Sequence, residues 1–347
     1  MKKALIQIKL RHMSYFSTLV SWLRITAPAF VLLLFASLSQ PLNAQDILQD
    51  EVTVEASDGR LLTYFVQRPL ETAPVPLLLV IDGSGCLGAK RDGFAELMSP
   101  AGNPDLRYAR LVVGKSGVPE TQSDPDACTE EFLQNYSMQK RVLDHMRVLQ
   151  SLRSNAQWWN GDLLIYEWSD GGDIAVRLFA YTPDATRLAF GGVGGGYTMQ
   201  EHFERFWACP QDLGEAQSGC LEDLRRIFKD IRENPTWRKT WAGPSNSYLA
   251  WDSRLSTRLT PLLKDEWRDV LMVHGADDFE GAPVQSARKL ADDLAALDND
   301  TFTYWEVKGM SHDMWSLAPE MALQLERNTL IWLLKGQADL LPIIVER

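Results

Sequence analysis

Short apolar runs alternate along this chain with longer segments in which apolar residues recur every three or four positions. A continuous apolar run that stops abruptly, often at glycine, is typical of a strand buried on both faces. Such runs are VPLLLVI at 75–81, ARLVV at 109–113, DLLIYEW at 162–168, RLAFGG at 187–192 and DVLMVHG at 269–275. TFTYWEV at 301–307 is expected to be the last strand. Before them, EVTVEA and LLTYFVQ flank an Asp-Gly turn, which predicts an edge hairpin.

Three segments show the 3.6-residue period of amphipathic helices. They are MQKRVLDHMRVLQSL at 138–152, VQSARKLADDLAAL at 284–297 and LQLERNTLIWLLK at 323–335. In the second, Leu297 is expected to continue the apolar stripe, and in the third, Leu323 shares such a stripe with two later leucines. Strands that alternate with helices are joined by right-handed crossovers, so the pattern predicts an α/β fold with a mostly parallel sheet flanked by helices.

Residues 197–267 interrupt this alternation, because they contain no convincing buried strand. An excursion from the end of a strand in an open α/β sheet covers the carboxyl edge, where such folds bind ligands. We therefore expect residues 45–347 to form one domain with 197–267 as a helical cap. His202 and Trp207 in the cap, and Trp168 at a strand end, are candidate pocket residues. The alternative is an elaborated surface.

The first 44 residues have the composition of a cleaved export signal. Basic residues precede the apolar run APAFVLLLFASL at 27–38, and PLNA ends at Ala44, after which cleavage is expected. The run is shorter than the roughly 20 residues that span a bilayer, so we expect no stable membrane anchor. An uncleaved anchor is the alternative. The expected location is the periplasm or the cell exterior.

The charge of the chain narrows the class of ligand. The formal net charge is −11, and loss of the leader, which holds five basic and no acidic residues, changes it to −16. A surface of that sign repels phosphate backbones and anionic headgroups, which argues against nucleic-acid partners and electrostatic membrane docking. Small molecules or short peptides are the expected partners. The oligomeric state is left open.

The four cysteines, Cys86, Cys128, Cys209 and Cys220, all follow the leader. An even count in an exported chain predicts disulfide bonds. Of the three connectivities we favour Cys86–Cys128 and Cys209–Cys220, the second because the turn-rich segment CPQDLGEAQSGC would close a short loop. No pair has C-x-x-C spacing and no histidine is grouped with them, so no metal site is expected.

The stretch IYEWSDGGDIAV at 165–176 places a serine between a buried strand and a helical pattern. A sharp turn there would lift the Ser169 hydroxyl clear of the backbone and aim the N–H of Asp170 at an oxyanion. Gly171 and Gly172 would let the helix pack closely. A serine hydroxyl is a weak nucleophile by itself, so Ser169 needs a base within hydrogen-bond reach.

The order of these elements and the turn WSDGG resemble the α/β-hydrolase superfamily, in particular its prolyl-oligopeptidase and dienelactone-hydrolase branch. The resemblance covers nearly all of the chain after the leader, apart from 197–267. It implies an acid after the nucleophile in a Gly-x-x-Asp context, which is Asp278 in VHGADD, with Asp277 as the alternative. It also implies a later histidine as general base, and only His312, in VKGMSHDMW, follows the acid.

The same resemblance implies that a second oxyanion donor comes from the loop after the third strand. That loop is IDGSGCLG at 81–88, whose glycines let the backbone approach a substrate, and either Ser84 or Gly85 would donate. Another glycine-rich loop, VVGKSG, lacks the first glycine of a Walker motif, so we expect a loop near the pocket mouth with Lys115 exposed or facing substrate. No cofactor is expected.

These features predict an exported serine hydrolase that cleaves an ester through an acyl-enzyme, with Ser169, Asp278 and His312 as its triad. An exopeptidase of the prolyl-oligopeptidase type is the first alternative, although those enzymes usually carry a large N-terminal propeller domain that is not expected here. The second alternative is an inactive binding protein. Its basis is Glu167, which stands where Gly-x-Ser-x-Gly has glycine and would bring negative charge near an oxyanion.

Overall fold

The computed structural model describes residues 46–70, 73–207, 209, 216–279 and 281–346. The predicted export signal and its cleavage site lie outside these residues. No helix in the described part of the chain is long and apolar enough to cross a membrane.

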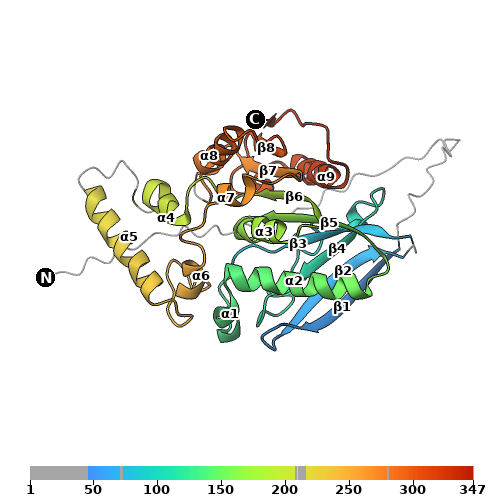
Figure 1. The fold of residues 1–347 in the computed structure, drawn as a ribbon, viewed down its shortest axis with the longest axis horizontal. Coiled ribbons are helices and arrows are strands. Elements are labelled where there is room, and N and C mark those ends of the chain that lie inside the picture. The colour runs from blue at the N-terminus through green and yellow to red at the C-terminus, as the bar shows by residue number, and fades with distance from the viewer. Residues whose placement is uncertain (1–45, 71–72, 208, 210–215, 280, 347) are drawn as a thin grey trace, which may run out of the picture. The chain divides into compact units, whose positions relative to one another are not determined.

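Within the described residues the strands form one nine-stranded sheet in the order β1-β2-β4-β3-β5-β6-β7-β8-β9 (Figure 1). Their bounds are β1 (Ile47–Glu55), β2 (Leu61–Pro69), β3 (Val75–Ile81), β4 (Ala109–Val113), β5 (Trp159–Trp168), β6 (Ala185–Gly191), β7 (Val270–Gly275), β8 (Phe302–Val307) and β9 (Ile344–Glu346). From β4 to β8 the neighbours are parallel, while the edge hairpin β1–β2 is antiparallel. The predicted hairpin and parallel sheet are confirmed. The expectation that β8 is the last strand is wrong, because β9 adds an antiparallel edge to it.

Helices connect and cover these strands. They are α1 (Glu130–Asn135), α2 (Met138–Asn155), α3 (Asp170–Tyr181), α4 (Met199–His202), α5 (Ala216–Glu233), α6 (Tyr248–Asp252), α7 (Thr260–Leu263), α8 (Val284–Ala295) and α9 (Pro319–Lys335), with short turns η1 (Pro100–Gly102), η2 (Phe203–Trp207) and η4 (Met314–Ser316). The side chain of Ser137 caps α2 by accepting a bond from the Lys140 N–H. Gly336 ends α9 in the left-handed conformation that glycine adopts at little cost.

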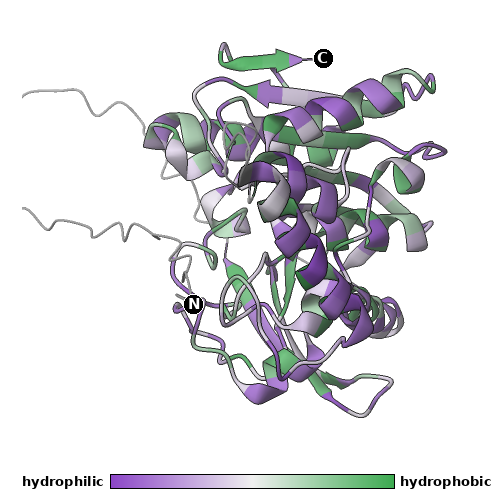
Figure 2. Ribbon diagram, turned by 90° about the vertical axis from the view of Figure 1, so that its left-hand side faces the viewer, coloured by the Kyte–Doolittle hydropathy of each residue, from purple (hydrophilic) through white to green (hydrophobic). Residues whose placement is uncertain are grey.

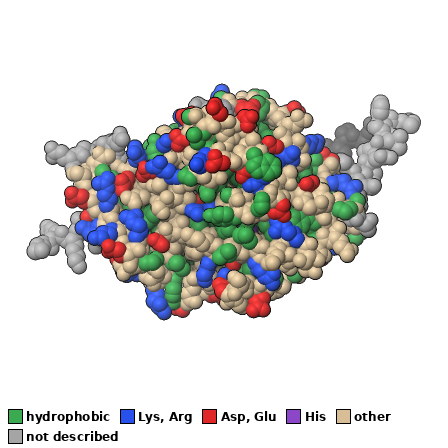
Figure 3. All heavy atoms as spheres, in the orientation of Figure 1, with side chains coloured by type: hydrophobic (Ala, Val, Ile, Leu, Met, Phe, Trp, Pro, Cys, Tyr) green, Lys and Arg blue, Asp and Glu red, His purple; other side chains and the backbone are tan. Residues whose placement is uncertain are grey.

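Alternate residues of the central strands pack into two separate core layers. Leu77 and Leu79 face α2, α3 and α8, whereas Leu78 and Val80 face α9 and the segment around η1. Figure 2 shows the resulting arrangement, with apolar strands inside and hydrophilic helix faces outside. On the face drawn in Figure 3, acidic and basic side chains are mixed rather than gathered by sign.

Two expected apolar positions are exposed instead. Leu323 on α9 is 58% exposed, and Leu297, beyond the end of α8, is 53% exposed. The buried side of α9 includes two polar residues, Glu326 and Thr329, so hydropathy alone misplaced its stripe. The Glu326 carboxylate accepts a bond from the Met98 N–H, which satisfies it inside the core.

Residues 197–267 hold α4 to α7 and build an aromatic core of their own. Phe203, Phe228 and Trp251 pack there together with Cys209. In Figure 1, α4, α5 and α6 lie together beside the sheet. The chain then returns to the main core, because Leu259 packs with the residues under α3 and α8.

Both expected disulfide bonds are present: Cys86 bonds to Cys128 and Cys209 bonds to Cys220. They close loops with sequence separations of 42 and 11 residues. The longer loop restricts the unfolded chain more, so its loss should cost more stability.

We expect the double change Cys86→Ser with Cys128→Ser to lower the free energy of unfolding by about 4 kcal/mol. The matched change Cys209→Ser with Cys220→Ser should lower it by about 3 kcal/mol. Urea denaturation of the two variants and the wild type, followed by circular dichroism, measures both losses. A larger loss from the shorter loop would contradict this account.

Candidate active site

Ser169 occupies a strained turn between β5 and α3, with φ 64° and ψ −135°. Residues other than glycine rarely adopt this conformation, which costs on the order of 1–3 kcal/mol. The Ser169 N–H donates to the Gly191 carbonyl on β6 at 2.8 Å, which fixes the turn to the sheet. A Cβ on Gly191 would lie 2.2 Å from the Trp168 ring, so the turn fits only because residue 191 has no side chain.

Three side chains from three strand ends meet at this turn. His312 Nε2 lies 2.9 Å from Ser169 Oγ, and His312 Nδ1 lies 2.9 Å from Asp278 Oδ2. Asp278 follows β7 and His312 follows β8, and these strands are parallel neighbours. Their carboxyl ends therefore share one edge of the sheet. The structure places Asp278 against the imidazole, whereas Asp277 is exposed.

Backbone hydrogen bonds fix the position of the Asp278 carboxylate beside the His312 imidazole. Its Oδ1 accepts bonds from the N–H groups of Gly281 and Ala282, both at 3.0 Å. Burial acts to raise the pKa of Asp278, but the bonds from His312 and Ala282 outweigh it and hold the pKa below its ordinary value. Asp278 is therefore ionised at neutral pH and can hold the Nδ1–H of His312.

The other described histidines are poor candidates for a base acting on Ser169. His145 and His274 are fully buried, and each bonds a backbone carbonyl through one ring nitrogen. Burial lowers the pKa of His145 to about 3 and that of His274 to about 4. His202 on α4 lines a pocket beside Ser169, and burial lowers its pKa to about 4, so it is a neutral wall of that pocket.

Glu167 is buried under the turn, with only 1% of its surface exposed. Its carboxyl group packs against Gly171, where a Cβ would meet Glu167 Cδ at 2.1 Å. Burial raises the pKa of Glu167 well above its ordinary value, and the nearby carboxylates of Asp82 and Asp170 raise it further. These effects favour the protonated form of Glu167 in the folded protein.

Two pockets meet at Ser169, and Ser84 and His312 line both of them. The first has a volume of about 260 Å³ and is walled by the cap through His202, Phe203, Trp207 and Trp251. The second has a volume of about 310 Å³ and lies on the other side, between Trp168, Leu87 and Trp315. The three pocket candidates from the sequence thus line two different pockets. The Trp168 Nε1–H also donates to the His312 carbonyl at 2.6 Å.

The expected oxyanion donors lie around the same point. Asp170 is the first residue of α3, so its N–H has no acceptor within the helix. Ser84 follows β3 and lines both pockets together with Ser169. Among the lining residues described for these two pockets, Gly85 is absent. Gly85 instead packs against Pro125, with φ 80°.

Two side chains at the site, those of Tyr136 and Arg254, were not found from the sequence. Asp170 Oδ2 accepts bonds from Tyr136 Oη and Arg254 Nη2, both at 2.6 Å. Tyr136 precedes α2 and Arg254 follows α6, so a loop of the main domain and a loop of the cap both reach the residue next to Ser169. Neither side chain belongs to a local motif, and only the fold brings them together.

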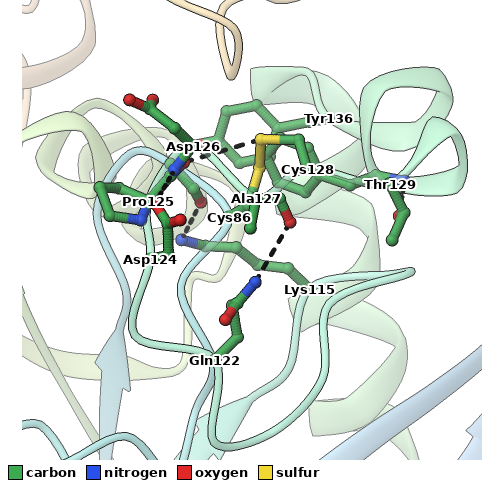
Figure 4. Close-up of a disulfide and its surroundings, with 12 residues drawn as sticks. Cys86, Lys115, Gln122, Asp124, Pro125, Asp126, Ala127, Cys128, Thr129 and Tyr136 are labelled. Carbon is green, nitrogen blue, oxygen red and sulfur yellow. Dashed lines mark hydrogen bonds between the residues drawn. A yellow bond between two sulfur atoms is a disulfide. The ribbon is translucent and has the colours of Figure 1, made fainter.

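The Cys86–Cys128 disulfide lies in the loop that carries Ser84. Figure 4 shows it beside Tyr136 and Lys115. The Cys86 N–H donates to the Pro125 carbonyl at 3.0 Å, so the loop is tied at this point by a covalent and a hydrogen bond.

No protein-family model and no curated protein matches the sequence. Solved structures do match. A Bacteroides ovatus protein provisionally assigned as a dipeptidyl aminopeptidase IV is 13% identical, with a TM-score of 0.55, over 83% of this chain and 36% of its own. The present chain thus spans about a third of that protein.

For two other matching structures, the alignment with this chain covers almost their whole length. A Klebsiella pneumoniae protein provisionally assigned as a dienelactone hydrolase is 15% identical, with a TM-score of 0.54, over 84% of this chain and 99% of its own. Est1E from Butyrivibrio proteoclasticus, solved with ferulic acid bound, is 12% identical, with a TM-score of 0.55, over 82% of this chain and 98% of its own.

These similarities agree with the sheet described above, which is mostly parallel and has an antiparallel hairpin at the β1 edge. At such low identity they establish the architecture alone. The chain has the α/β-hydrolase fold, as its resemblance to that superfamily implied.

Proposed function

We propose that the protein is a serine hydrolase that cleaves carboxylic esters through an acyl-enzyme intermediate. The observation that carries this proposal is the continuous chain of bonds from Ser169 Oγ through His312 to Asp278, at a strained turn that opens into two pockets. A nucleophile, a base and an orienting acid in hydrogen-bond contact are the parts that acyl transfer needs.

In the first half of the reaction, Ser169 Oγ attacks the acyl carbon and His312 Nε2 takes the hydroxyl proton. The tautomer required has its proton on Nδ1, and the bond to Asp278 Oδ2 favours that tautomer and the imidazolium that forms. The oxygen of the tetrahedral intermediate becomes negative and accepts bonds from the backbone N–H groups of Asp170 and Ser84. His312 then protonates the leaving alcohol as the ester C–O bond breaks.

In the second half, water enters and His312 Nε2 removes its proton. The hydroxide attacks the acyl carbon of the Ser169 ester, and the same N–H groups stabilise the second oxyanion. Collapse of this intermediate returns the proton from His312 to Ser169 Oγ and releases the carboxylic acid. The net reaction consumes one water, and the protein is regenerated.

The first pocket supports an ester over a peptide with a free amino end. Asp170 and Asp173 are the acidic side chains described in its lining, and they pair with Arg254 and Arg177. Because an arginine already offsets the charge of each carboxylate, they attract a peptide ammonium group less than unpaired carboxylates would. Aromatic residues of the cap fit an apolar group instead. An exopeptidase remains the second candidate, on the basis of the similarity to the Bacteroides ovatus protein.

The position of Glu167 weakens the case for an inactive binding protein. That case depends on a charged carboxylate near the oxyanion, which would oppose the charge that develops in catalysis. The side chain packs beneath the turn on Gly171, and its raised pKa favours the uncharged form. Glu167 lines the second pocket, but the first pocket at Ser169 does not include it in its described lining.

We also propose that the protein acts in the periplasm or outside the cell. Two disulfide bonds support an oxidising compartment, where such bonds persist. The leader pattern in residues 1–44 supports the same location.

A fluorophosphonate probe should label the wild-type protein and fail to label Ser169→Ala. His312→Ala should react more slowly by about four orders of magnitude, because the hydroxyl loses its base. Labelling is read by intact-mass spectrometry. Labelling that persists in Ser169→Ala would remove Ser169 as the nucleophile, and an unlabelled wild type would favour the binding protein. Rates on p-nitrophenyl esters and dipeptidyl anilides separate esterase from exopeptidase.

Adjacent carboxylates offer a matched pair of variants for the orienting acid. Asp278→Asn should lower kcat on a p-nitrophenyl ester by about 10⁴-fold, because an amide at this position favours the wrong imidazole tautomer. Asp277→Asn should stay within about threefold of the wild type, since that side chain is exposed. The opposite ranking would assign the acid to Asp277.

Glu167→Gln tests the protonation state of the buried acid. The pKa of Glu167 is raised in the folded protein, so the stability it contributes is fully present below the unfolded value of 4.5 and is lost as pH rises toward the folded pKa. Relative to Glu167→Gln, the free energy of unfolding of the wild type should fall by about 1.4 kcal/mol per pH unit above about pH 5. Urea denaturation at several pH values measures this difference, and a difference that does not change with pH would show that Glu167 is ionised when folded.

A further inference from the structure

Lys115 follows β4 and is almost completely buried, which corrects the expectation that it is exposed or faces substrate. Only 2% of its side chain is accessible. Its Nζ lies 2.6 Å from the Gly83 carbonyl, 2.9 Å from the Gly85 carbonyl and 2.7 Å from Asp82 Oδ2. All three acceptors belong to the loop after β3. The ammonium group thus donates hydrogen bonds to two carbonyls and forms an ion pair with Asp82.

The Gly83 carbonyl accepts a bond from Lys115 Nζ at 2.6 Å and a longer one from Tyr136 Oη at 3.5 Å, and the orientation of this carbonyl sets the direction of the next N–H. The Gly83 carbonyl and the Ser84 N–H belong to one planar trans peptide unit and point in opposite directions. Because Lys115 holds this carbonyl on the buried side, the Ser84 N–H is turned away from Nζ. Ser84 lines both pockets together with Ser169, so that direction leads to the site. Within the described part of the chain, no acceptor is recorded for the Ser84 N–H.

The peptide unit between Gly85 and Cys86 is also held through both its carbonyl and its N–H group. Lys115 binds the Gly85 carbonyl, and the Cys86 N–H of the same peptide unit donates to the Pro125 carbonyl at 3.0 Å. The Cys86–Cys128 disulfide anchors this point covalently (Figure 4). At the other end of the loop, Asp82 binds Arg91 through Oδ1 and Lys115 through Oδ2.

We propose that Lys115 is a positioning residue that holds the loop 82–86 so that the Ser84 N–H, rather than that of Gly85, serves as the second oxyanion donor. This proposal rests on the proposed esterase function. Lys115 itself touches neither substrate nor the reacting atoms. Its effect should therefore appear in the transition state, where the oxyanion needs a correctly placed donor, and much less in substrate binding.

The test compares two buried cations that tie backbone carbonyls. Arg268 donates to the carbonyls of Phe179, Thr182 and Ala185 and pairs with Glu266, and neither pocket at Ser169 includes it in its described lining. Arg268→Met therefore removes a similar network away from the site. Lys115→Met removes the proposed positioning with little change of side-chain length.

On a p-nitrophenyl ester we expect Lys115→Met to lose about 10²-fold in kcat with KM within about threefold of the wild type, as a misplaced catalytic group does. Its affinity for a boronic acid, which forms a tetrahedral adduct, should fall by a similar factor. Arg268→Met should keep kcat and the affinity for the boronic acid within about threefold of the wild type, although its midpoint of thermal unfolding falls. Thermal unfolding of both variants verifies that they are folded.

An active Lys115→Met with unchanged kcat and boronic-acid affinity would overturn the proposal while the esterase function stands. Equal losses of kcat in both variants would also overturn it, because a general loss of stability would then explain the effect. If Lys115→Met does not fold, Asp82→Asn combined with Lys115→Met removes both buried charges, while the amide oxygen at position 82 can still accept a bond from Arg91. The same loss of kcat is expected of that double variant. A wild type that is inactive and unlabelled refutes the function itself.

Discussion

The conformation of Ser169 constrains the residues around it more than any other feature of the molecule. A serine at φ 64° is stable only if neighbouring chain segments approach closely enough to hold it there. Gly191 allows the approach of β6, and Gly172 allows contact with Val193, where a Cβ would meet a methyl carbon at 2.3 Å. Gly171 provides the space that Glu167 fills. The departure from Gly-x-Ser-x-Gly at residue 167 is thus compensated by the absence of a side chain at residue 171.

The architecture was predictable because each buried strand is a continuous apolar run and each major helix shows apolar residues with a period of about 3.6 residues. The loops after β5, β7 and β8 inherit their positions from the sheet, so Ser169, Asp278 and His312 were brought to one edge by strand order alone. In a parallel sheet the loops that follow neighbouring strands all lie at the same carboxyl edge, so residues that are distant in sequence lie close together there. This is why residues more than 30 positions apart could be placed together before their contacts were known.

Other features depend on tertiary contacts that leave no local pattern. Lys115 in VVGKSG reads as a surface lysine, and its burial follows only from the three acceptors that surround it. Tyr136 and Arg254 meet at Asp170 from segments with no shared motif. The strand β9 has three residues, too few for any period to be visible. In each case the position of the residue depends on the tertiary contacts it makes and not on the residues next to it in sequence.

The proposed reaction would create a new negative charge among the carboxylates already present at the site. An uncompensated carboxylate about 5 Å from an oxyanion would raise its energy by about 3 kcal/mol at an effective dielectric constant near 20. Asp82 is paired with Arg91 and Lys115, and Asp170 with Arg254, while burial raises the pKa of Glu167 and favours its protonated form. Asp278 contacts His312 Nδ1, where the proposed mechanism forms a positive imidazolium in the same step as the oxyanion. By offsetting the charges of Asp82 and Asp170, Arg91, Lys115 and Arg254 reduce the repulsion that an oxyanion would meet in the proposed reaction.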